Sequence, residues 1–389
     1  MDCYSYETLE SDYNNFTDPI VQVFVDDENI HDNKGGVSIS DVLVDLTCGF
    51  EAGQAAFSLY DCYDMVKTKF EYDKVKKYIM LGSTVRVAMG YGMTTREVFR
   101  GIIVRVDFVV DETDAPHVRV TAMDVKGIMM ANHYHKRLMS DFYSGAIKEI
   151  FAQDVYMGLV GPTGVISELS ISDTPDMFSL SADVGESDKT IEMVGESDYE
   201  FIVRCAKRFN YEFFCIGGQV LFREAKSDPS TLLSFSNTSK IFSLNVSYDI
   251  TGLVSSVTVR GLDAGKAKVI ESTMRNSNKI SGSSQAKAMI NGSEYIYVDP
   301  TVTAKDEAQR RAWYVFDDMA YRFGTLDMEI MGIPEVIPGR FIDLNDYGTA
   351  VSNTFYVTSV QHHMDRDGRY TTRVIGKAQT LQTDLASMV

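Results

Sequence analysis

The chain has 389 residues, of which 44% are hydrophobic and 11% aromatic, so it can form well-packed cores and global disorder is excluded. Its formal net charge is −18, with no cluster of Lys and Arg, which excludes the electrostatics of sequence-independent nucleic-acid binding and disfavours anionic membranes. No run of about 18 apolar residues occurs, so membrane insertion is not predicted. The length predicts two or three domains.

Residues 1–17 read as a polar, acidic N-terminal leader. This layout is the opposite of a secretory signal, which begins basic and continues apolar. Five cysteines occur, an odd number without paired spacing, namely Cys3, Cys48, Cys62, Cys205 and Cys215. The leader and the cysteines together predict folding in a reducing cytoplasm.

Residues 18–130 are predicted to form a first tube-like antiparallel β-barrel. In the stretch 83–89, Val85, Val87 and Met89 alternate with polar or small residues, which is the period of a half-buried strand. The long apolar stretch "FRGIIVRVDFVV" and the stretch "HVRVTAMD" flank the acidic turn "DETDAP". Such alternation with short turns is typical of an antiparallel meander or barrel.

Residues 131–235 are predicted to form an intervening α+β domain, with a short amphipathic helix over 144–154. A second helix follows Ser197, because Ser197 and Glu200 have the spacing of a capping box. Its apolar residues recur at the spacing of one buried helix face, namely Phe201, Ile202, Cys205, Ala206 and Phe209. Asn210 suits the left-handed position that ends a helix.

A hairpin is predicted after this helix, with strands Tyr211–Ile216 and Gln219–Arg223 joined by the two-residue turn Gly217-Gly218. The acidic residues of the segment therefore initiate a helix. Cys205 faces inward and Cys215 lies on a strand. Because buried thiols are usually unreactive, we interpret this segment as scaffold rather than as a catalytic site.

Residues 236–262 and 325–380 are predicted to form a second tube-like β-barrel, followed by a C-terminal tail over 381–389. Between its parts, 263–324 is predicted as an insertion of a polar loop and a helix. The loop, 263–294, is rich in Ser, Lys, Asn and Gly and has little apolar periodicity. The helix is expected over about 304–323, with Thr303 as its start signal and Gly324 as its stop signal. It has a predicted buried stripe, namely Ala308, Ala312, Phe316, Met319 and Phe323.

A faint internal repeat links the two predicted barrels. "LGSTVRVAMGYG" (81–92) and "IPGRFIDLNDYG" (337–348) each place a Gly before an alternating strand and a Tyr-Gly after it. A long strand, an acidic turn and a strand with a central Arg-Val follow in both cases. The shared order of four elements predicts a duplicated module.

Few side chains form a pattern that suggests chemistry. His133 and His135 could share one face of a strand but lack an evident third ligand, whereas His362 and His363 are adjacent and face opposite sides. The segment 365–369, "DRDGR", lacks the distal Glu of a calcium loop, and 90–95, "GYGMTT", lacks the Lys of a phosphate loop. We therefore predict no catalytic, cofactor-binding or metal-binding residue, and no enzyme.

The segment around the capping box resembles a characteristic part of the hub proteins of contractile injection machines. These include phage late control protein D, the T4-type baseplate hub and the hub part of type VI secretion valine-glycine repeat spike proteins. The matching residues are Glu196, Ser197, Asp198, Phe201, Arg204 and Phe213–Phe214. The barrel-like stretches "VFRGIIVRVD…VRVTAMD" and "PGRFIDL…YVTSVQHHMDRDGRYTTRVIG" extend the resemblance over roughly residues 18–380.

The resemblance implies a structural hub at the baseplate of a phage tail or related injection particle, assembled in the bacterial cytoplasm. Three chains with two barrels each would imitate a sixfold ring and adapt a hexameric tail tube to a trimeric spike. The implied partners are two further copies of the chain, the tail tube protein and the spike or central needle protein. Tape-measure and baseplate wedge proteins are further implied partners. We expect the spike and any cell-wall hydrolase to be separate polypeptides.

Two alternatives belong to other functional classes. A cell-wall or glycan-directed enzyme or binding module would require exposed aromatic residues of the 211–223 hairpin in a groove with paired carboxylates. A secreted effector carried by an injection machine is the other alternative. The absence of a targeting signal and the repeated barrel both argue against the effector.

Overall fold

The computed structural model describes residues 3–30, 36–175, 191–263, 267–275, 284–300, 302 and 304–380. The helices are α1 (Tyr6–Asp12), α2 (Tyr72–Val75), α3 (Val125–Met129), α4 (Tyr143–Phe151), α5 (Asp154–Met157), α6 (Asp198–Phe209), α7 (Ser284–Asn291) and α8 (Lys305–Ala320), with 3-10 turns η1 (Asn14–Phe16) and η3 (Lys76–Tyr78). The strands are β1 (Pro19–Val25), β2 (Glu28–Asn29), β3 (Ser38–Thr47), β4 (Gln54–Tyr60), β5 (Tyr63–Asp64), β6 (Lys69–Phe70), β7 (Thr84–Tyr91), β8 (Thr94–Val109), β9 (His117–Met123), β10 (Tyr134–Leu138), β11 (Glu168–Ile171), β12 (Ile191–Glu196), β13 (Tyr211–Ile216), β14 (Gln219–Glu224), β15 (Thr231–Phe235), β16 (Ile241–Tyr248), β17 (Ser256–Asp263), β18 (Lys268–Arg275), β19 (Glu294–Val298), β20 (Gly324–Met331), β21 (Phe341–Leu344), β22 (Asn353–Met364) and β23 (Tyr370–Ala378).

Six strands from the N-terminal part form the first β-unit, in the sheet order β1-β7-β8-β9-β4-β3. Every pair of neighbours in this order is antiparallel. The predicted inward residues Val85, Val87 and Met89 are fully buried, because alternate residues of a strand face the same side. The expected meander is therefore confirmed.

Six strands from the C-terminal part form the second β-unit, in the order β15-β21-β22-β23-β20-β16. The two orders match strand by strand: β15, β16, β20, β21, β22 and β23 occupy the places of β1, β3, β4, β7, β8 and β9. The one difference in direction is that β15 runs parallel to β21, whereas β1 runs antiparallel to β7. The fold class, a β-rich α+β protein with two similar tube-like sheets, is confirmed.

Small irregularities recur at matching positions of the two β-units. The pairing of β8 with β9 shifts register between Ile103 and Arg105, and that of β22 with β23 shifts between Val357 and Ser359. Gly82 and Gly339 both have positive φ, and their N–H groups donate to the carbonyls of Ile103 and Val357. A bulge and a turn that recur together match the two units residue by residue.

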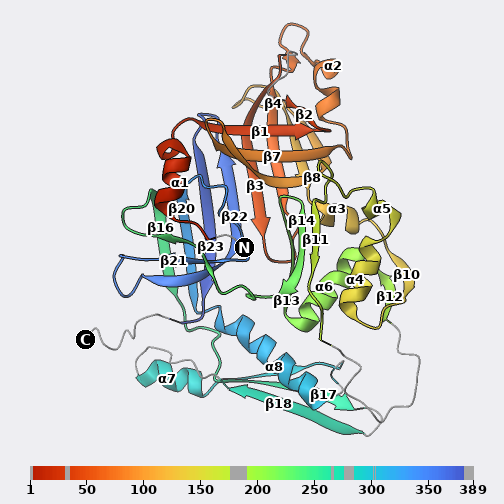
Figure 1. Cartoon of the computed structure of the whole chain (residues 1–389), viewed down its shortest axis with the longest axis vertical. Coiled ribbons are helices and arrows are strands. Elements are labelled where there is room, and N and C mark those ends of the chain that lie inside the picture. Colours follow the sequence, from red (N-terminus) through yellow and green to blue (C-terminus); the bar gives the residue numbers. More distant parts are fainter. Residues whose placement is uncertain are drawn as a thin grey trace.

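The two β-units join edge to edge, because the C-terminal half of β22 pairs antiparallel with β3. The result is one large sheet, in which the blue strands β20, β22 and β23 of the second unit lie beside the red and orange strands of the first unit (Figure 1). Buried side chains of both units belong to a single hydrophobic cluster. The two copies are therefore packed as one body.

A separate core lies under α4, α6 and the β13–β14 hairpin. The capping box of α6 is confirmed: Ser197 Oγ accepts from the N–H of Glu200 at 3.1 Å, and the Glu200 carboxylate accepts from the N–H of Ser197 at 2.7 Å. The predicted apolar face of α6 is buried, and Asn210 ends the helix with φ 58°. The turn Gly217-Gly218 has positive φ at both residues, as a tight hairpin requires.

The insertion between β16 and β20 differs from the prediction. Its described residues form a three-stranded sheet, β18-β17-β19, with α8 packed on it, rather than a polar loop (Figure 1). Helix α8 begins after Ala304, with Glu307 accepting from the N–H of Ala304, so Thr303 is not the cap and lies outside the described residues. The predicted stripe of α8 is buried. The sequence does not predict β18 and β19 because most of their side chains are exposed.

The N-terminal leader also differs from the prediction of a plain polar segment. Helix α1 packs on the shared core through Tyr6 and Leu9, and Tyr13 and Phe16 follow them into it. The Tyr13 hydroxyl donates to the buried Glu335 carboxylate at 2.7 Å. These four residues, spread over α1 and η1, thus anchor an otherwise acidic stretch. Among the described residues, no helix has the length and apolar character to cross a membrane.

Candidate assembly interface

The pairing of residues 42–47 of β3 with residues 359–364 of β22 is here called the β3–β22 interface. Its register places Ser359 opposite Thr47 and Met364 opposite Val42. Val360, His362 and Met364 face the core and have exposed fractions of 0%, 0% and 5%. The pairing therefore seals one long edge of each β-unit.

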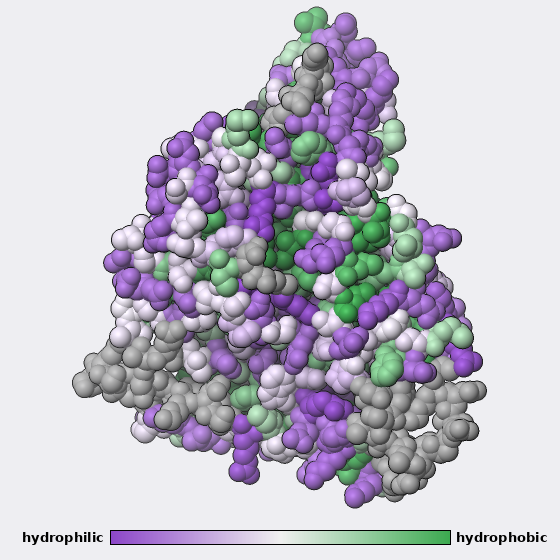
Figure 2. Space-filling model, in the orientation of Figure 1, coloured by the Kyte–Doolittle hydropathy of each residue, from purple (hydrophilic) through white to green (hydrophobic). Residues whose placement is uncertain are grey.

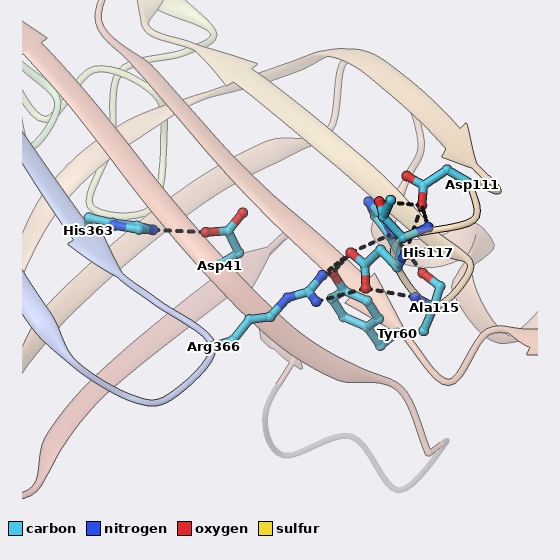
Figure 3. A network of polar contacts seen from close by, with 9 residues as sticks. Asp41, Tyr60, Asp111, Ala115, His117, His363 and Arg366 are labelled. Carbon is cyan, nitrogen blue, oxygen red and sulfur yellow. Dashed lines mark hydrogen bonds and ion pairs between the residues drawn. The ribbon is translucent and has the colours of Figure 1, made fainter.

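Polar side chains hold the outer face of this interface (Figure 3). His363 Nε2 lies 2.8 Å from Asp41 Oδ1, and Gln361 Nε2 donates to Asp45 Oδ1 at 2.7 Å. At the end of the strands, the Arg366 guanidinium donates to the Asp114 carboxylate and stacks 4.7 Å from the Tyr60 ring. These contacts fix the register of two segments that are far apart in the chain.

His362 is the one histidine of the interface that is fully buried. Its Nε2 donates to the Val336 carbonyl at 3.2 Å, and Nδ1 lies 3.0 Å from Thr372 Oγ1 and 3.1 Å from the Tyr370 hydroxyl. Burial lowers the pKa of His362 to about 4, and the bond to Val336 only partly opposes this effect. The ring is therefore held neutral beneath β22.

We expect acid to destabilise the fold through His362. In the unfolded chain the imidazole gains its proton near pH 6.5, but in the folded chain only near pH 4, so stability falls as the pH drops between these values. From pH 7 to pH 4.5 this residue should lower the free energy of unfolding by about 2 kcal/mol. Urea unfolding of His362→Gln should show a weaker pH dependence. The same change at the exposed His135 is the control, and equal pH profiles for His362→Gln and the unaltered chain would contradict the expectation.

Two strand edges lack the partner that the β3–β22 interface supplies elsewhere. β16 takes the place of β3 in the second β-unit but pairs only with β20 among the described residues. β8 takes the place of β22, yet beyond Ile103 it pairs only with β9 in the same described part of the chain. Apolar side chains are exposed there: Phe108 at 49% and Val110 at 60%. Unpaired edges with exposed apolar residues are where another chain can add strands.

The histidine, cysteine and loop candidates do not assemble into a reactive site. His133 and His135 are both exposed, and His133 lies 3.3 Å from Glu200. No group of three potential metal ligands occurs among the described residues. Burial raises the pKa of the Cys205 thiol to about 12 and also raises the pKa of Cys48, Cys62 and Cys215. As predicted, "DRDGR" forms a hairpin turn, in which Asp365 Oδ1 accepts backbone N–H groups.

The aromatic hairpin does not provide the platform that a glycan-directed protein would need. Tyr211, Phe213 and Phe214 are 8%, 0% and 0% exposed. A cleft of about 650 Å³ lies between this hairpin and α8. Of its two lining carboxylates, Glu212 is buried against the Tyr356 hydroxyl and Arg223, and only Asp318, which pairs with Arg322, is exposed. Figure 2 shows mixed polar and apolar side chains over this face, with apolar ones gathered near β11 and β14. Neither feature forms a groove with paired, accessible carboxylates.

One family model matches most of the chain, over residues 21–366, and it is described as the Alg8 N-terminal domain. The chain belongs to the Alg8 N-terminal domain family. No curated protein matches it. This family description does not name the hub proteins that the sequence analysis expected.

Solved structures show the fold that this family member shares. A tail protein from Neisseria meningitidis has a TM-score of 0.65 at 13% identity, covering 94% of this chain and 98% of that chain. A prophage tail protein from Shewanella oneidensis has a TM-score of 0.64 at 12% identity, covering 92% and 98%. An Escherichia coli component of the type VI secretion system, described as similar to T4 bacteriophage tail proteins, has a TM-score of 0.52 at 10% identity, covering 91% and 76%. The chain thus has the fold of tail proteins.

The predicted repeat covered only part of what the two β-units share. It matched β7, β8 and β9 with β21, β22 and β23, and these strands occupy the same places in the two sheets. It missed β1 with β15, β3 with β16 and β4 with β20. The insertion separates β16 from β20 along the chain. Val44 and Val246 keep the inward alternation in β3 and β16, which is the signal that could have found the match.

Proposed function

We propose that the chain is the structural hub of a phage tail or related contractile injection particle. Three copies form a ring of six similar β-units, which adapts a hexameric tail tube to a trimeric spike. The observation that carries this proposal is the same six-strand order occurring twice in one chain, with the two copies joined edge to edge. A trimer of such chains presents six near-equivalent surfaces to a sixfold partner.

The fold that the chain shares with tail proteins supports the proposal, but the ring and the partners named here go beyond that fold. The first β-unit consists of β1, β3, β4 and β7–β9, and the second of β15, β16 and β20–β23. The domain around α6 and the insertion sheet with α8 decorate the ring. The tail tube protein contacts one face of the ring and the spike contacts the other, while tape-measure and wedge proteins are further partners. No catalytic step is part of this function.

Native mass spectrometry of the purified chain tests the proposal directly. The expected species is a trimer, with three times the 43.5 kDa mass of one chain. Electron microscopy of that species should show a closed ring with six similar lobes around a central opening. A chain that stays monomeric at every concentration, or that forms a closed twofold dimer, would overturn the proposal.

A further inference from the structure

The β3–β22 interface has an unfilled counterpart on each side of the chain. In the second β-unit, β22 is paired on its outer edge and β16 is open, whereas in the first β-unit β3 is paired and β8 is open. The edges of β3 and β16 are of one kind and the edges of β22 and β8 of the other. One edge of each kind is paired within the chain, and one is open. An interface between one kind of edge and the other is head-to-tail, so repeating it generates a ring or a filament.

We infer that β16 of one protomer pairs antiparallel with residues 105–110 at the end of β8 of the next protomer, in the register that β3 and β22 use inside one chain. This inference rests on the proposed function and names the surface that builds the proposed ring. The occupant of each open edge is a second copy of this chain. The argument for that occupant is that the chain already carries the same contact between its own two β-units.

The matching positions on β8 and β22 follow from the shared bulge. Counting from the register shift, Val106 corresponds to Val360, Phe108 to His362 and Val110 to Met364. On the other partner, β16 and β3 are matched through β20 and β4, so that Val246 corresponds to Val44. The two correspondences together fix one interprotomer register.

The predicted pairs, written with the β8 residue first and the β16 residue of the next protomer second, are Arg105 with Asp249, Val106 with Tyr248, Asp107 with Ser247, Phe108 with Val246, Val109 with Asn245, and Val110 with Leu244. An Arg faces an acidic residue, and no like charges stand opposite each other, which favours this register. Its inward pairs are all apolar or aromatic.

Burial at matching positions shows what the open edge lacks. His362 and Met364 are 0% and 5% exposed under β3, whereas Phe108 and Val110 are 49% and 60% exposed. The Phe70 ring packs edge-on against the Phe108 ring, with 5.0 Å between ring centroids, and Phe108 still remains half exposed. Phe242, at the start of β16, is also exposed at 45%. Docking β16 on β8 would bury the same inward face that β3 buries on β22.

Two polar contacts of the β3–β22 interface have no counterpart on the open edges. His363, which bonds Asp41, corresponds to Val109, and Arg366, which pairs with Asp114, corresponds to Glu112. The internal contact therefore has polar contacts that the contact between chains lacks. The contact between chains depends on strand pairing, apolar burial and the predicted pair of Arg105 with Asp249. This difference suits a ring whose protomers fold before they assemble.

Disulfide trapping tests the register. In a Cys3→Ser background, which removes the exposed thiol, Val109→Cys with Asn245→Cys places two cysteines opposite each other across the predicted interface. Oxidation should give a covalent trimer on a denaturing gel. The control, Val109→Cys with Asp249→Cys, places them about 13 Å apart along the strand and should cross-link at least roughly tenfold more slowly.

Val110→Asp provides a second, independent readout. A carboxylate at this apolar pair, which ends the predicted contact, should raise the concentration needed for trimer formation roughly 100-fold. The control is Met93→Asp, which has the same change in charge at a fully exposed turn residue away from both edges. Native mass spectrometry at a series of concentrations measures both variants.

The outcomes separate the inference from the proposed function. A trimer that cross-links equally in the control pair, or not at all, or that survives Val110→Asp, overturns this interface while the hub proposal stands. A monomer at every concentration overturns the hub proposal and this interface together. A trimer with the predicted cross-link that is lost on Val110→Asp supports both.

Discussion

Met364→Asp should lower the free energy of unfolding by at least about 3 kcal/mol, whereas Val110→Asp should change it by less than about 1 kcal/mol in the monomer. The two residues occupy the same position in the two β-units. Met364 is 5% exposed beneath β3, so a carboxylate there is cut off from water without a partner. Val110 is 60% exposed at the open edge, where a carboxylate stays hydrated in an isolated chain.

Urea unfolding at a concentration too low for assembly measures both effects. Because the backbone position is the same in both units, the comparison controls for strand propensity and for the change in charge. A similar loss of stability in the two variants would show that the edge of β8 is already covered within one chain. That result would remove the open edge on which the interprotomer contact depends.

Lys126→Ala should be the second large effect, with a loss of about 3 kcal/mol in the free energy of unfolding. Lys126 is fully buried, and its Nζ donates to the Glu51 carbonyl at 2.8 Å and lies 5.1 Å from the centre of the Phe213 ring. Beside it, the Asp124 carboxylate accepts from the N–H groups of Gly53 and Lys126, and burial raises its pKa. Removing the lysine leaves this carboxylate buried without its nearest cation.

Two further variants separate charge from packing at Lys126. Lys126→Met keeps the aliphatic contact with Phe213 but not the charge, so it should recover part of the lost stability. Lys148→Ala removes a lysine whose ion pair with Asp173 is exposed, and it should cost less than about 1 kcal/mol. Equal stability of Lys126→Ala and Lys148→Ala would contradict a structural role for the buried lysine.

The local elements were predictable because their signals lie within a few residues. The capping box of α6, the Gly217-Gly218 turn and the alternation of β7 each follow from short-range spacing. The repeat was visible wherever three strands follow one another without interruption. These features decide their own conformation, so tertiary contacts only reinforce them.

The remaining features depend on contacts that are distant in the sequence. Whether β3 ends as a free edge or pairs with β22 is decided by residues at the other end of the chain, and no local pattern records that choice. Helix α1 is acidic on average, and only its contact with the shared core explains its position. The strands of the insertion pair with one another while most of their outward side chains remain in water, which hides their period.

The β3–β22 interface also determines when, during translation, the edge of β3 becomes protected from pairing with another chain. The Ser359 hydroxyl donates to the Leu46 carbonyl across 313 residues. β3 therefore stays unpaired on this edge until β22, near the end of the chain, has been synthesised. At about 5–20 residues per second, a ribosome needs roughly 15–60 seconds to add that length. Throughout this time the nascent N-terminal half exposes the unpaired edges of both β3 and β8. In the finished chain the unpaired edges are those of β8 and β16. Mispairing between copies of the chain is therefore most frequent on polysomes, where neighbouring nascent chains expose β3 at the same time.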